Sequence, residues 1–123
     1  VQHTRAAPGS ANIRVKGPSN PNPGANEVRD GHVTITGNVL SDTKVNVHLD
    51  HARGVVVTGN TFWTGVEHNL LVENSTGVVV GPNAMDRNPR YYREEDGSAN
   101  AVLFRNCSDC TVSGLFVKGT RTA

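Results

Sequence analysis

The chain has 123 residues and a formal net charge of +1, and 36% of its residues are hydrophobic while 5% are aromatic. This length indicates one domain, and neither the net charge nor a basic stripe interleaved with aromatic residues favours a nucleic-acid partner. No apolar run reaches the length of a membrane span or of a signal-peptide core, so the sequence predicts no membrane span.

Residues 1–30 are predicted to form an N-terminal strand followed by an irregular excursion. The strand is assigned to NIRVK at 12–16. The following segment, PSNPNPG at 18–24, is rich in Pro and Asn and is typical of an extended chain without packed structure of its own. We therefore separate this region from residues 31–123.

Residues 31–123 contain a repeat of about 22–23 residues. VTITGN at 33–38 aligns with VVVTGN at 55–60 and with VVVGPN at 78–83. Further columns advance with the repeat: Leu40, Phe62 and Met85; Val47, Leu70 and Val102; Leu49, Val72 and Phe104; Ala52, Ser75 and Cys107; Val55, Val78 and Cys110. Several columns that advance together indicate a repeat architecture.

Short segments of each repeat alternate apolar and polar residues, as in VNVHL at 45–49, which is the period of a β-strand. Clusters of Gly, Asn, Ser and Asp separate these segments, and no two-residue hairpin turn joins them. Each strand must therefore pair in parallel with its equivalent one repeat later, with coils about 4.8 Å apart. The sequence predicts an all-β solenoid of about four or five coils.

Asparagines recur in two of the columns. One column contains Asn38, Asn60 and Asn83, and the other contains His51, Asn74 and Asn106. Stacked Asn side chains can hydrogen-bond along the stack and tolerate the left-handed backbone of a corner. We therefore expect a structural role for both columns, including a corner hydrogen bond for His51. With the repeat length, these columns make residues 33–118 resemble the right-handed parallel β-helices of the pectate-lyase-like superfamily.

One segment carries a second resemblance to this superfamily. HLDH at 48–51 looks like a degenerate form of the hydrophobic-Asp-His stretch of the pectate lyases, with His48 where that family has Trp. The paired Asp and Arg-x-Lys motifs of the related polygalacturonases are absent from the sequence. The resemblance implies a secreted protein, extracellular or periplasmic, that acts on polysaccharides.

A charged row is predicted on the outer face of the coils. If Val47 and Leu49 point inward, Asp50 points outward, and the repeat places Glu73 and then Arg105 in its column. Neighbouring carboxylates repel each other unless they share a cation, an arginine or a proton. This predicts Asp50 and Glu73 as catalytic groups and as ligands of a calcium ion, with Arg105 holding an acidic sugar. The alternative is a solvated ladder with an ion pair between Glu73 and Arg105.

An inserted loop at about 86–100 adds about nine residues to the third repeat. Insertions in solenoids project from one face and often carry binding residues. We expect this loop to bind substrate through stacking tyrosines and anion-binding arginines, with one carboxylate as general acid or base. The substrate-binding residues are Arg87, Arg90, Tyr91 and Tyr92, and the catalytic carboxylate is Glu94. The alternative is a charged flap whose tyrosines seal the side of the helix.

The two cysteines, Cys107 and Cys110, form a single Cys-x-x-Cys motif. A zinc site needs four ligands, and a redox motif needs a helix that starts after a strand. The repeat places Cys110 inward and Cys107 at a corner, which favours packed thiols. A local disulfide and metal or redox chemistry remain open.

Two functions fit this sequence. The first is a part of a carbohydrate-active β-helix that binds or cleaves an acidic polysaccharide as a lyase or a hydrolase. The alternative is a non-catalytic structural or binding module, as in adhesins and tail fibres, and fold alone does not separate the two. Because a solenoid exposes an unpaired coil at each end, we expect further protein or a homo-oligomeric neighbour to cover the ends.

Overall fold

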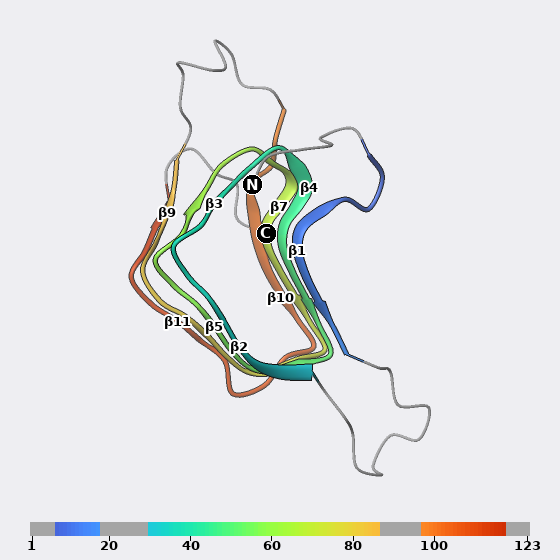
Figure 1. Cartoon of the computed structure of the whole chain (residues 1–123), viewed down its shortest axis with the longest axis vertical. Helices are drawn as coiled ribbons and strands as arrows, with labels where there is room; N and C mark the ends of the chain where they lie inside the picture. The colour runs from blue at the N-terminus through green and yellow to red at the C-terminus, as the bar shows by residue number, and fades with distance from the viewer. Residues whose placement is uncertain (1–6, 18–29, 87–96, 118–123) are drawn as a thin grey trace.

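The structure is a computed structural model that describes residues 7–17, 30–86 and 97–117. In these ranges all regular secondary structure is β-strand, and the strands form three parallel sheets (Figure 1). The first sheet contains β1 (Ala11–Lys16), β4 (Thr43–Asp50), β7 (Gly65–Glu73) and β10 (Ala101–Arg105). The second contains β2 (Asp30–Ile35), β5 (Ala52–Val57), β8 (Thr76–Val80) and β11 (Thr111–Val112). The third contains β3 (Val39–Leu40), β6 (Thr61–Phe62), β9 (Asn83–Met85) and β12 (Leu115–Val117).

Successive strands along the chain belong to different sheets, so each passage through the three sheets closes one coil. The pairing partner of a strand is its equivalent one repeat later, as when Val47 lies opposite Leu70 and Leu70 lies opposite Val102. Figure 1 shows these coils superimposed around a common interior. The predicted right-handed parallel β-helix is confirmed, and its four-stranded sheets agree with the predicted number of coils.

The interior is filled by the apolar columns that the repeat predicts. Leu40, Phe62 and Met85 are all 0% exposed, and they stack where the third sheet faces the core. The first sheet contributes the next two columns through β4 and β7, with their alternate residues pointing outward. Full burial of each such side chain contributes about 1.5–3 kcal/mol, so this stack is the main source of stability.

The corner between the first and second sheets requires left-handed backbone. His51, Asn74 and Asn106 occupy this corner in successive coils with φ of 52°, 50° and 54°. Asn and His are among the residues that adopt this conformation more readily, which explains the column in the sequence. The predicted corner role of His51 agrees with this geometry.

The second asparagine column lies at the corner before the third sheet, where Asn60 and Asn83 are buried and Asn38 is partly buried. The Asn38 Nδ2 group donates to Asn60 Oδ1 at 3.0 Å, and Asn60 Nδ2 donates to Asn83 Oδ1 at 3.0 Å. The backbone N–H groups of Asn38 and Asn60 donate to the same two side-chain oxygens. Each amide both donates and accepts, so one residue type can continue the column indefinitely.

A further asparagine ladder was not predicted. Asn12 Nδ2 donates to Asn46 Oδ1 at 2.8 Å, and Asn46 Nδ2 donates to Asn69 Oδ1 at 2.7 Å. The 23-residue step from Asn46 to Asn69 is a signal that the sequence offers, but Asn12 is separated from Asn46 by the excursion. The ladder ends at an irregularity in β10, where His68 pairs with Ala101 but Leu70 pairs with the next residue, Val102. This explains why the buried Asn69 Nδ2 atom has no hydrogen-bond partner.

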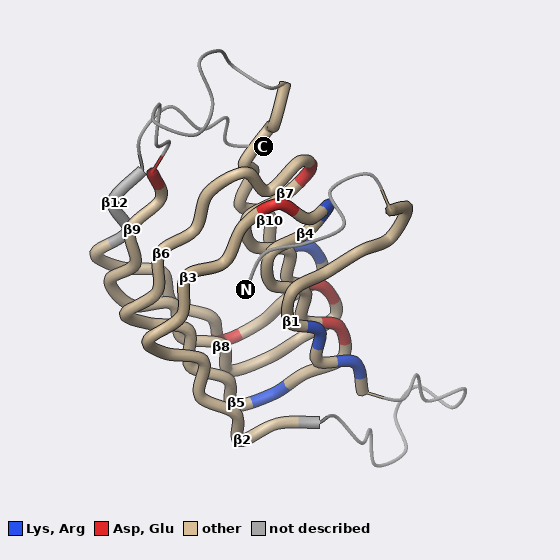
Figure 2. The backbone as a smooth tube through the Cα atoms, turned by 45° about the horizontal axis from the view of Figure 1, so that its top comes forward, with Lys and Arg blue, Asp and Glu red and all other residues tan. Residues whose placement is uncertain are grey.

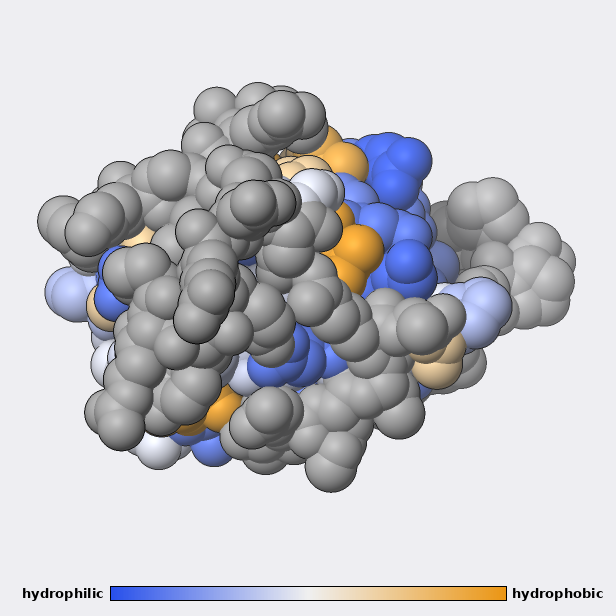
Figure 3. Space-filling model, turned by 90° about the horizontal axis from the view of Figure 1, so that it is seen from above, coloured by the Kyte–Doolittle hydropathy of each residue, from blue (hydrophilic) through white to orange (hydrophobic). Residues whose placement is uncertain are grey.

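The core columns are less covered in the first and last coils. Ile13, Val15 and Val33 are only partly buried at one end, and Val112 is 46% exposed at the other. On the side face drawn in Figure 3, the described apolar residues reach the surface as small separate patches beside hydrophilic ones. The core is therefore less completely covered in the first and last coils than in the middle ones.

Candidate functional site

The outer face of the first sheet carries two rows of polar side chains. The register places Lys16, Asp50, Glu73 and Arg105 in one row, and it places Arg14 beside His48 in the next. Figure 2 shows two acidic segments in neighbouring coils on this side, with basic segments on either side of them. The row of Asp50, Glu73 and Arg105 is the one that the repeat predicts, and Lys16 extends it by one coil.

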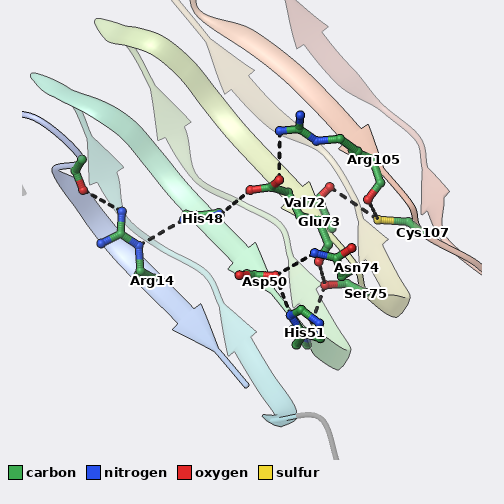
Figure 4. Close-up of polar contacts among 12 residues, drawn as sticks. Arg14, His48, Asp50, His51, Val72, Glu73, Asn74, Ser75, Arg105 and Cys107 are labelled. Atoms are coloured by element: carbon green, nitrogen blue, oxygen red, sulfur yellow. Dashed lines mark hydrogen bonds and ion pairs between the residues drawn. The ribbon is translucent and has the colours of Figure 1, made fainter. Parts of the chain in front are cut away.

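Glu73 is bound on both carboxylate oxygens by protein groups. Its Oε1 lies 2.9 Å from His48 Nε2, and its Oε2 lies 2.9 Å from Arg105 Nη2 (Figure 4). The Arg105 side chain is 61% exposed, whereas that of Glu73 is 22% exposed. This is the ion pair that the alternative interpretation of the row predicts.

The hydrogen bonds define the state of the His48 ring. Arg14 Nε donates to His48 Nδ1 at 3.1 Å, and a guanidinium can only donate. In the neutral ring, Nδ1 is therefore the acceptor, and Nε2 carries the proton that it donates to Glu73. Arg14, His48, Glu73 and Arg105 form one continuous chain of contacts across the four strands of the sheet.

Asp50 is held by the corner residues. Its Oδ1 lies 2.7 Å from His51 Nδ1, and it accepts a hydrogen bond of 3.1 Å from Asn74 Nδ2. Burial alone would raise the pKa of Asp50, but the hydrogen bonds from Asn74 and His51, with the charges of His51 and His48, lower it below its usual value. Asn106 continues the network by donating to Asn74 Oδ1 at 2.8 Å.

This arrangement does not support the predicted calcium site. Calcium binds six to eight oxygen ligands, whereas Asp50 and Glu73 already accept from protein donors. Among the described residues no group of three or more His, Cys, Asp or Glu side chains could hold a metal ion. The catalytic roles of Asp50 and Glu73 and the sugar-binding role of Arg105 stay predictions.

The predicted substrate-binding loop falls largely outside the described residues. This applies to Arg87, Arg90, Tyr91, Tyr92 and Glu94. Their roles therefore also stay predictions.

A second polar feature lies on β7, where His68 was not predicted to have a site role. Its Nδ1 atom is buried without a hydrogen-bond partner. Burial lowers the pKa of His68 below its usual value, although the charge of Glu67 acts in the opposite direction. The imidazole is therefore favoured in its neutral form.

The two cysteines lie in the last coil as free thiols packed against the edge of the core. Cys107 Sγ donates to the carbonyl oxygens of Arg105 at 3.3 Å and Val72 at 3.4 Å, and Cys110 Sγ donates to the Ser108 oxygen at 3.3 Å. Burial raises the pKa of Cys110, and the neighbouring Cys107 thiol acts in the same direction. Of the interpretations left open by the sequence, the structure shows packed thiols.

A family model described as "Periplasmic copper-binding protein (NosD)" matches residues 9–122. No curated protein and no solved structure matches the chain. None of the described segments forms a helix with the length and hydropathy of a membrane span.

Proposed function

The chain belongs to the NosD family of periplasmic copper-binding proteins, and on that premise we propose that it is a non-catalytic β-helix that binds copper. The family is periplasmic, which agrees with the predicted extracellular or periplasmic location. The observation that carries the proposal is the family match, which includes nearly the whole chain.

The state of the carboxylates on the outer face also favours a non-catalytic module. A glycosidase-type mechanism needs one carboxylic acid with a raised pKa beside a second carboxylate across the sugar. Instead, the pKa of Asp50 is lowered by its hydrogen bonds, and both oxygens of Glu73 are bound by His48 and Arg105. These groups are suited to holding adjacent coils together.

The side chains present fit one oxidation state of copper better than the other. Cu(II) prefers several nitrogen and oxygen ligands in a tetragonal arrangement, and no such group of His, Asp or Glu exists among the described residues. The soft thiols of Cys107 and Cys110 are the kind of ligand that selects Cu(I). When bound, copper would be held by side chains of the scaffold, and the proposed function requires no reaction of the copper.

The proposal is tested by metal binding to the purified chain under anaerobic, reducing conditions. We expect saturable retention of Cu(I) in competition with a chromophoric Cu(I) chelator and no binding of Ca²⁺ in a calorimetric titration. A folded sample that retains no copper would contradict the copper-binding function. New reducing ends or unsaturated products after incubation with polysaccharides would contradict the non-catalytic role.

A carbohydrate-binding function is the second candidate. It is supported by the exposed guanidinium of Arg105 on the outer face and by the composition of the predicted loop. Its test is titration with neutral and acidic polysaccharides, repeated on an Arg90→Ala, Tyr91→Ala double variant. Saturable binding by the wild type that the double variant loses would support a carbohydrate site on the loop. If the folded wild type binds none of the polysaccharides, this function is excluded.

A further inference from the structure

The corner between the first and second sheets has the same backbone shape in three successive coils. In each, one left-handed residue is followed three positions later by another. The pairs are His51 and Gly54, Asn74 and Gly77, and Asn106 and Asp109, with φ of 52° and 60°, 50° and 63°, and 54° and 53°. Equal backbone conformations direct equivalent side chains the same way, so the third corner can be compared with the two before it.

Two side chains of each corner point into the core. In the first two coils these are Ala52 with Val55, and Ser75 with Val78, and each is at most 1% exposed. The register continues into the last coil, because Thr76 bridges Ser108 and Val79 pairs with Thr111. Cys107 therefore replaces Ser75, and Cys110 replaces Val78.

Both thiols therefore enter the core from the same side of the same corner. Both side chains pack against the same core cluster, and burial together with the neighbouring Cys107 thiol raises the pKa of Cys110. In addition, both cysteines are only partly buried, unlike their equivalents in the earlier coils. The pair is apolar on its inner side and partly exposed to solvent.

The present partners of the thiols are weak and replaceable. Each Sγ atom donates to backbone carbonyl oxygens at 3.3–3.4 Å, and S–H groups are weak donors. The two thiols are not joined by a disulfide. Binding a metal here would not break an ion pair of the outer face.

We propose that Cys107 and Cys110 together bind one Cu(I) ion in this last corner, a proposal that rests on the copper-binding function above. Each thiol loses its proton to solvent, two Cu–S bonds form, and copper remains Cu(I), so no electron is transferred. Two thiolates satisfy the low coordination number of Cu(I). Zinc prefers four ligands, and the described residues supply no third or fourth ligand beside the pair.

The earlier coils supply matched variants for the test. Cys107→Ser introduces the residue of the preceding coil, and Cys110→Val introduces the residue of both preceding coils. The double variant therefore replaces the thiols with side chains that the same corner already accommodates. Circular dichroism and thermal unfolding check that it folds.

The measurement is Cu(I) competition with a chromophoric chelator under anaerobic, reducing conditions, with sulfur coordination read by X-ray absorption. We expect one copper per wild-type chain, bound by two sulfur ligands. The double variant should lose more affinity than the roughly 10–100-fold that follows loss of an outer-shell partner. Each single variant should lose most of this affinity, because one thiolate cannot complete the site.

The outcomes separate this inference from the function on which it rests. If the wild type binds copper and the folded double variant binds it equally, copper lies elsewhere, so this site is wrong and the copper-binding function stands. If the reduced wild type binds no copper, both proposals fail. If spectroscopy shows nitrogen or oxygen ligands in place of two sulfurs, the cysteine site is also wrong.

Discussion

Two columns of polar side chains join successive coils, one inside the solenoid and one on its surface. The inner column repeats one residue, in Asn38, Asn60 and Asn83, and each member bonds to the next. The outer row of Lys16, Asp50, Glu73 and Arg105 changes residue at every coil. A buried amide must find both a donor and an acceptor, and another amide supplies both, whereas water can satisfy exposed groups. Burial therefore explains why the inner column repeats one residue type and the outer row does not.

The largest effect is expected from breaking the inner column at its centre. Asn60→Ala removes bonds to Ile35, Asn38 and Asn83, and it leaves the partly buried Asn38 N–H group without its acceptor. We expect a loss of about 2–4 kcal/mol in the free energy of unfolding, measured by urea denaturation. Asn38→Ala, at the partly exposed end of the column, is the control. An equal loss in the control would contradict the role assigned to burial.

Substitutions in the ladder of Asn12, Asn46 and Asn69 should reduce the free energy of unfolding by less than Asn60→Ala does, and by different amounts at Asn46 and Asn69. Asn46→Ala removes bonds to Asn12, Asn69 and the Trp63 carbonyl, so we expect a loss of about 1–3 kcal/mol. Asn69→Ala should cost less, because its Nδ2 atom already has no partner. Thermal unfolding of both variants measures the difference. A more destabilised Asn69 variant would contradict the assignment of Asn69 as the end of the ladder.

Acid should lower the free energy of unfolding, because Asp50 on the outer face becomes protonated. Its pKa is lowered in the folded state, so its stabilising effect is complete above the unfolded value of 3.8 and is lost as the pH falls through the folded pKa. The free energy of unfolding, measured from about pH 6 down to pH 3, should fall at the acid end. Asp50→Asn should reduce this fall. Parallel pH profiles of the wild type and the variant would show that Asp50 does not contribute to it.

The smallest effect is expected from Glu73→Gln. The Arg105 partner in the lost ion pair is 61% exposed, so the cost should be only about 0–1 kcal/mol in the free energy of unfolding. Glu67→Gln, at an exposed position of the same strand, is the control. A loss as large as that of Asn60→Ala would show that the outer row contributes as much to the fold as the inner column.

The sequence predicted the parts of this molecule that depend on local pattern. Alternation along 45–49 determined which side chains point inward, and the 22–23-residue step determined that Val47 lies over Leu70 and Leu40 over Phe62. The ion pair of Glu73 with Arg105 also followed from its column. The ladder from Asn12 to Asn46 did not, because the excursion between them breaks the repeat.

The amino-acid sequence by itself determined the coils, their inward columns and their corners, because a period of two and a fixed repeat length leave one way to stack the strands. Only the tertiary structure decided which hydrogen-bond and ion-pair partners the outward-facing side chains have. From the sequence, Asp50 and Glu73 could have shared a cation. In the structure, His51 and Asn74 instead bind Asp50. His48 and Arg105 bind Glu73. The repeat predicted an inward Cys110, but the structure decided that the corner residue Cys107 also packs against the core, because the left-handed corner turns both side chains inward. Such contacts depend on rotamers and on neighbours from other coils, which a repeat pattern does not encode.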